Sequence, residues 1–98
     1  MIPFRIIRAA QRDVRKIRRY NDRQSPGLGD EFLREFAHTV RLIREYPEGS
    51  TEVRPGIRRA LLRRFKYSIL YQLKDGEAII IAVMHHRQKP DTWLKRLQ

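Results

Sequence analysis

The chain has 98 residues, and its 22 lysines and arginines against 11 aspartates and glutamates give a formal net charge of +11. This length suits one core, so we expect a single domain over residues 1–98. The sequence has no cysteine, which excludes disulfides and fits a reducing cytoplasm. The longest apolar stretch, residues 78–84, is too short to span a bilayer, so we expect no membrane association. The excess of positive charge predicts an acidic partner.

The first half of the chain predicts one strand and two helices. Residues 2–8 place apolar side chains at every second position, which predicts an edge strand. Over residues 9–20 the apolar side chains recur at helical spacing and basic residues fill the other positions, so this helix is amphipathic and strongly basic. Turn-forming residues at 25–29 separate it from a second helix over residues 30–46, which a proline ends.

The second half predicts strands. Residues 57–64, 67–73 and 78–85 are rich in β-branched and aromatic side chains, and an Asp-Gly pair joins the last two segments as a tight hairpin. Pro90 begins a short final helix. We therefore expect an α+β fold in the order β-α-α-β-β-β, with an antiparallel sheet, a helical hairpin on one face and a short C-terminal helix.

Positive charge is concentrated in one part of the sequence. Residues 53–74 hold seven basic residues and no acid. Six of these lie close together, namely Arg54, Arg58, Arg59, Arg63, Arg64 and Lys66. An arginine can pair two phosphate oxygens at once, so the ligand is either a nucleic-acid backbone or an acidic protein segment. The alternative is a solvated strand edge without a ligand.

Two histidines and Arg87 close the last predicted strand. Because side chains alternate across a sheet, at most one of His85 and His86 can share a cleft with Arg59 or Arg63. A histidine that moves protons beside an arginine that stabilises phosphate would suit metal-independent RNA cleavage. A strand-end histidine without a role is the alternative. The sequence has no glycine-rich phosphate loop, nucleophile elbow or metal-ligand spacing, so we expect no cofactor and no metal.

Aromatic residues could stack on nucleic-acid bases or fill the core. Tyr67 and Tyr71 alternate with Ile69 on one apolar face of a predicted strand, which favours core packing.

Two segments carry a family resemblance. LRRFKYSILY at residues 62–71 and AVMHHRQKPDTWLKR at residues 82–96 are similar to the closing signature of RelE/ParE toxins. The helical pattern from Asp13 to Tyr20 and the Tyr46-Pro47 pair resemble this family as well. The resemblance implies a compact sheet with two helices on one face, and a growth-arresting toxin of a type II toxin–antitoxin system. It also implies a hetero-oligomer with a small acidic antitoxin, whose disordered tail folds on binding.

This superfamily includes two activities. RelE-like members cleave mRNA on the ribosome without a metal, whereas ParE-like members inhibit DNA gyrase and have no assigned catalytic residues. Arg59, Arg63 and His86 match basic positions of the nuclease group and would be catalytic in a RelE-like protein.

Other positions depart from the nuclease pattern. Ser68 stands where that group commonly carries an arginine, and Leu61 stands at a lysine position. Trp93 falls near the terminal tyrosine but has no phenolic proton. The resemblance therefore favours a gyrase inhibitor, with ribosome-dependent mRNA cleavage as the alternative and a non-toxic nucleic-acid-binding module as the third possibility. In each case we expect contacts to the target or antitoxin from Arg54, Arg58, Arg59, Arg63, Arg64, Lys66, Arg87 and Trp93.

Overall fold

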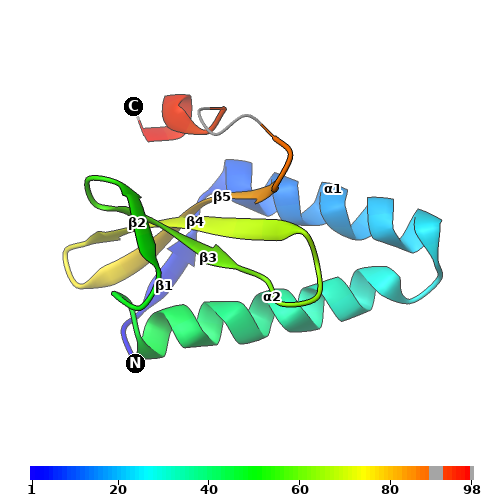
Figure 1. Cartoon of the computed structure of the whole chain (residues 1–98), viewed down its shortest axis with the longest axis horizontal. Coiled ribbons are helices and arrows are strands. Elements are labelled where there is room, and N and C mark those ends of the chain that lie inside the picture. Colours follow the sequence, from blue (N-terminus) through cyan, green and yellow to red (C-terminus); the bar gives the residue numbers. More distant parts are fainter. Residues whose placement is uncertain (89–91, 98) are drawn as a thin grey trace.

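The computed structural model describes residues 1–88 and 92–97. Its elements are β1 (Phe4–Ile6), α1 (Arg8–Gln24), α2 (Leu28–Glu45), β2 (Thr51–Arg54), β3 (Ile57–Leu61), β4 (Tyr67–Lys74), β5 (Glu77–His85) and a 3-10 helix (Leu94–Leu97). Figure 1 shows α1 and α2 as a hairpin beside the sheet, with the turn between them extending past the strand ends. The expected α+β fold is confirmed. No helix in the described part of the chain is long and apolar enough to cross a membrane.

The sheet has five strands in the order β1-β5-β4-β3-β2. All neighbours pair antiparallel except β1, which pairs parallel to β5 with Phe4 opposite Ala78. The sheet is therefore mixed, and the expectation of a purely antiparallel sheet is corrected at this strand. A strand of only three residues carries no pattern that fixes its neighbour or direction. The short edge strand β2 was not expected either, because all four of its residues are exposed and show no apolar alternation.

The segment between β3 and β4 differs from its expected structure. The strand predicted to reach residue 64 ends at Leu61. The Leu62 amide donates to the Tyr67 carbonyl at 3.0 Å, and this bond closes a hairpin whose loop includes Arg63, Arg64 and Lys66. Pro90, where the final helix was expected to begin, lies outside the described residues.

Both faces of the sheet are apolar. On the helix face, Tyr67, Ile69 and Tyr71 pack in one core with residues of α1 and α2, so the predicted core role of the two tyrosines is confirmed. On the opposite face, Leu70 and Met84 pack with Trp93. The C-terminal segment, residues 92–97, thus covers part of a face that would otherwise expose apolar side chains to water.

A β-bulge interrupts the pairing of β4 with β5. Leu70 pairs with Ala82 but Tyr71 pairs with Ile80, so Ile81 has no partner on β4. An extra residue shifts the alternation of side chains by one position. Ala78 and Ile80 therefore contact the helix-side core before the bulge, and Val83 does so after it.

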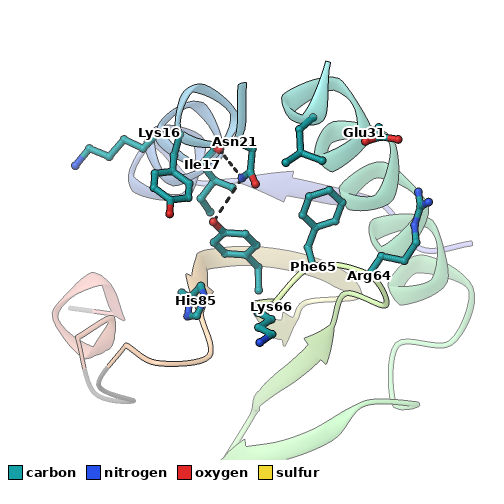
Figure 2. A pocket seen from close by; sticks show the side chains of 11 residues that line it. Lys16, Ile17, Asn21, Glu31, Arg64, Phe65, Lys66 and His85 are labelled. Carbon is teal, nitrogen blue, oxygen red and sulfur yellow. Dashed lines mark hydrogen bonds between the residues drawn. The ribbon is translucent and has the colours of Figure 1, made fainter. Parts of the chain in front are cut away.

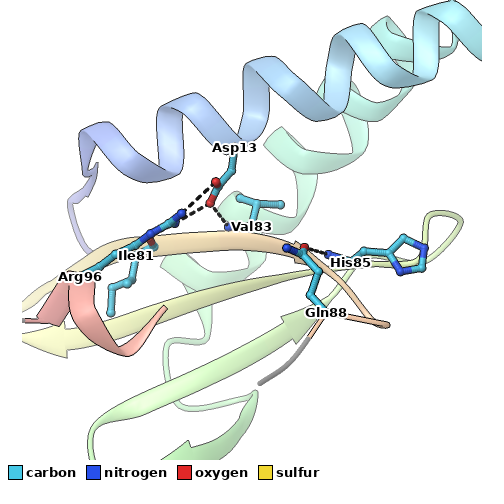
Figure 3. Close-up of polar contacts among 6 residues, drawn as sticks. All are labelled: Asp13, Ile81, Val83, His85, Gln88 and Arg96. Atoms are coloured by element: carbon cyan, nitrogen blue, oxygen red, sulfur yellow. Dashed lines mark hydrogen bonds and ion pairs between the residues drawn. The ribbon is translucent and has the colours of Figure 1, made fainter. Parts of the chain in front are cut away.

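β1 pairs with β5 only as far as Ile80. Beyond this point an ion pair contacts the outer edge of β5 (Figure 3). Asp13 of α1 accepts from the Val83 amide at 3.0 Å and from both terminal nitrogens of Arg96 at 2.6 and 3.1 Å. Arg96 also donates to the Ile81 carbonyl at 3.0 Å. One carboxylate and one guanidinium thus replace the ladder bonds that a longer β1 would provide, and they join α1, β5 and the C-terminal segment.

Replacing Asp13 with alanine should lower the free energy of unfolding by about 2 kcal/mol, because it leaves the Val83 amide and the Arg96 guanidinium without their acceptor. Urea unfolding measures the loss. Asp30→Ala is the matched control, since it removes an exposed pair with Arg18 and should cost about 1 kcal/mol or less. Equal losses in the two variants would contradict the role given to Asp13.

Candidate functional site

A groove of about 620 Å³ lies between α1, the start of α2 and the loop before β4 (Figure 2). We call it the helix–sheet groove. It is lined by Lys16, Ile17, Tyr20, Asn21, Leu28, Glu31, Arg64, Phe65, Lys66, Tyr67 and His85. The aliphatic and aromatic side chains form its floor, while three cations and a single carboxylate lie among its polar groups. Such a groove suits an amphipathic segment with acidic side chains.

Buried and partly buried contacts hold the walls of the helix–sheet groove in place. The Asn21 side-chain amide donates to the Ile17 carbonyl at 2.8 Å and to the Tyr67 hydroxyl at 3.5 Å, which ties α1 to β4. The Gly29 amide donates to the Asp22 carboxylate at 2.8 Å. A Cβ at this glycine would lie 2.6 Å from the Arg18 carbonyl oxygen, so the two helices approach closely only because residue 29 has no side chain.

Glu35 anchors the loop that borders the groove. Its side chain is only 8% exposed, and its two carboxylate oxygens accept from the Arg64 amide at 3.1 and 3.0 Å. The Arg64 guanidinium lies 3.4 Å away but is 70% exposed, so the backbone contact is the more important one. We did not identify Glu35 from the sequence. A carboxylate on the buried face of α2, beside Phe32 and Phe36, is the signal that could have found it.

A second, smaller cavity of about 170 Å³ lies on the opposite face of the sheet. We call it the sheet pocket, and its polar lining includes Arg54, Arg59, Ser68 and His86. Ser68 is 2% exposed, and its hydroxyl has no hydrogen-bond partner among the described residues. Trp93 also lines this cavity and is 4% exposed, so its indole covers the sheet instead of projecting into solvent.

The residues singled out from the sequence are distributed over several surfaces. Arg59, His85 and His86 share the sheet pocket with Arg54 and Trp93. The expectation that at most one histidine shares a cleft with Arg59 is therefore wrong, because β5 ends at His85 and His86 lies in the turn after it. Arg64 and Lys66 border the helix–sheet groove. Arg63 instead lines a separate surface beside Arg34 and His38. Of the three residues considered for catalysis, the structure therefore brings together only two.

Two further residues that were singled out from the sequence, Arg58 and Arg87, make local contacts. Arg58 donates to the Glu48 carbonyl at 3.1 Å and to the Ser50 carbonyl at 2.7 Å, so its guanidinium holds the segment between α2 and β2. Arg87 is exposed, and its amide donates to Nδ1 of His85 at 3.0 Å.

His85 borders both cavities, and its ring packs edge-on against Tyr67 at 5.4 Å. Burial, followed by the charges of Arg87, His86 and Lys66, lowers the pKa of His85 below its ordinary value of 6.5. Each of these causes disfavours a positive charge on the ring. Because Nδ1 accepts a hydrogen bond, the neutral ring carries its proton on Nε2.

Removing the charge of Arg87 in an Arg87→Gln variant should raise the pKa of His85 toward 6.5, because one repulsive cation is lost. An NMR titration of the imidazole C–H signals measures this shift. Arg63→Gln serves as the control and should leave the titration unchanged.

The lowered pKa also gives stability a pH dependence with a defined sign. The unfolded chain takes up the proton first, so the contribution of His85 is complete above pH 6.5 and is lost as the pH falls toward the folded-state pKa.

Comparison with known proteins identifies the family. The model of a family described as "ParE toxin of type II toxin-antitoxin system, parDE" matches residues 4–90. A chain of a solved structure entitled "Chromosomal ParDE TA system from P. aeruginosa" is similar with a TM-score of 0.76 and 19% identity, over 87% of this chain and 96% of that chain. At this identity the likeness concerns the fold alone. A comparison with curated proteins finds no match. Because the family model covers nearly the whole sequence, the chain belongs to the ParE toxin family of type II toxin–antitoxin systems.

Proposed function

We propose that the protein arrests bacterial growth by inhibiting DNA gyrase, and that a small acidic antitoxin neutralises it. We favour gyrase inhibition over mRNA cleavage because the candidate catalytic residues lie on separate surfaces. Arg59 and His86 line the sheet pocket, while Arg63 lies on a different surface.

Metal-independent RNA cleavage needs a proton acceptor, a proton donor and a cation around one phosphate. The sheet pocket is lined by two arginines and by His85 and His86, but the ring of His85 packs edge-on against Tyr67. Trp93 stands beside them, but its buried ring has no phenolic proton to donate. A toxin that acts by binding has a different requirement, namely an exposed surface with shape and charge that complement the target. Arg59 lines the sheet pocket, Arg87 lies shortly after β5, and both are exposed. We assign these two residues to the contact with gyrase.

The helix–sheet groove is our candidate for the antitoxin site. Its apolar floor would receive the apolar side chains of an amphipathic segment, and Lys16, Arg64 and Lys66 would meet the acidic ones. A disordered segment gains this contact at the cost of ordering itself, so it binds well only where charge and apolar burial act together.

The purified protein should inhibit supercoiling by gyrase and leave ribosome-bound mRNA intact. A double variant, Arg59→Ala with Arg87→Ala, should weaken the inhibition by about tenfold or more, because charged contacts at an interface are worth about 1 kcal/mol or more each. A variant with Arg34→Ala and Arg41→Ala, which removes two exposed cations of α2, controls for total charge and should remain active.

Cleavage of mRNA at ribosomal A-site codons, with gyrase unaffected, would instead identify a RelE-like nuclease. Normal growth of bacteria that contain the soluble protein would contradict both toxin activities and leave a non-toxic binding module.

Reversing charge in the groove should uncouple the toxin from its antitoxin. A Lys16→Glu and Lys66→Glu variant should bind the small protein encoded beside the toxin gene about a hundredfold more weakly, because like charges across an interface cost several kcal/mol. Titration calorimetry measures the affinity, and co-expression should no longer restore growth. Arg41→Glu with Lys74→Glu changes the net charge equally away from the groove, and this control should still be neutralised.

A further inference from the structure

The outward face of α1 carries a row of arginines that neither the groove nor the sheet pocket uses. Spacings of three and four residues place them along one side of the helix, and all of them are exposed. We call this row the arginine stripe, and it consists of Arg8, Arg12, Arg15, Arg19 and Arg23.

No carboxylate neutralises the stripe. The two acids of α1 are engaged elsewhere, since Asp13 binds the Val83 amide and Arg96, and Asp22 accepts from the Gly29 amide. Within residues 1–88 and 92–97, the structure shows no hydrogen bond or ion pair from the five guanidinium groups. The five positive charges of the stripe therefore have no ion pair in the described part of the chain.

This arrangement opposes the formation of the helix that carries it. Like charges three or four residues apart repel each other. Arg8 also lies at the N-terminal end of α1, whose first turn has no acid and whose N-cap makes no side-chain hydrogen bond, so its charge opposes the helix dipole. The residues that pack α1 onto the core, Ala10, Val14 and Ile17, lie on another side. Packing thus gives no reason for the stripe, whereas a polyanion would remove the repulsion.

We propose that the arginine stripe binds the phosphate backbone of double-stranded DNA. From Arg8 to Arg23 the helix rises by about 22 Å. One strand of B-DNA carries about six phosphates over the same length. Each of the five arginines therefore has a phosphate within its range, and the guanidinium fork can pair two oxygens of one phosphate.

An acidic protein is a poorer fit to this face. A protein interface needs an apolar centre that is removed from water. Tyr20 is the one large hydrophobic residue exposed on α1, and it lines the helix–sheet groove. The stripe consists of charge without an apolar anchor, which is typical of backbone binding that does not depend on sequence.

The test is binding of the purified chain to a labelled DNA duplex of arbitrary sequence and longer than the stripe, measured by fluorescence anisotropy between about 50 and 200 mM salt. In a variant with Arg12→Gln, Arg15→Gln and Arg19→Gln, the slope of log affinity against log salt should fall by about 2.7, since each lost phosphate contact removes about 0.9. Affinity at the low-salt end should fall at least tenfold.

The matched control removes the same charge elsewhere, with Arg34→Gln, Arg41→Gln and Lys74→Gln, and should change the slope by less than about one. Glutamine and arginine have similar helix propensities, and repulsion is relieved, so the stripe variant should unfold at the same or a higher urea concentration. A lower midpoint for the stripe variant would indicate a structural role and overturn the proposal.

Other outcomes also overturn it. These are no binding to DNA, an equal loss of slope in both triple variants, tighter binding to duplex RNA, or displacement of DNA by polyglutamate at a lower concentration of negative charge. The last of these would identify an acidic protein as the partner. Because the assay contains no gyrase, its result is independent of the proposed inhibition.

Discussion

The extra residue in β5 determines which side of the sheet every later side chain of that strand occupies. Ile80 and Val83 both contact the helix-side core although they lie three residues apart, and this is possible only because Ile81 is unpaired with β4. The bulge thereby directs the ring of His85 toward Tyr67, and both His85 and His86 line the sheet pocket with Arg59. The Ile81 carbonyl is held by Arg96, which is held by Asp13. An ion pair between α1 and the C-terminal segment thus contacts the bulged residue from which the alternation shifts.

Local patterns in the sequence specified much of the fold. The alternation of Tyr67, Ile69 and Tyr71 correctly predicted the buried face of β4, and the Asp75-Gly76 pair has the positive φ angles of 52° and 77° that a tight hairpin requires. The bulge could not be predicted in the same way. Residues 78–84 are apolar on both faces of β5, so no polar residue marks where the alternation shifts. The parallel pairing of β1 likewise depends on tertiary contacts that three residues do not encode.

The sequence predicted only part of the distribution of positive charge over the surface. Residues 53–74 hold seven bases and no acid, and we expected one positive surface there. The structure divides these cations, since Arg58 binds backbone carbonyls, Arg59 lines the sheet pocket and Arg64 borders the helix–sheet groove. On α1, seven bases and two acids lie within 17 residues, and helical periodicity gathers five of these bases on one face. Density along a sequence is therefore a weaker guide to a binding surface than periodicity within a known element.

The groove and the stripe belong to the same helix but present different sides of it, so an occupied groove need not block the stripe. A ligand in the groove would neutralise Lys16 and Lys66, and this lowers the positive potential around α1. At physiological ionic strength, however, charges separated by more than about 8 Å in solvent are largely screened. Coupling through electrostatics alone would then be small between the groove and the distant end of the stripe at Arg8, and larger near Arg15 and Arg19, the neighbours of Lys16. An acidic antitoxin in the groove would therefore weaken a DNA contact without abolishing it, unless the antitoxin continues along α1 and covers the arginines directly.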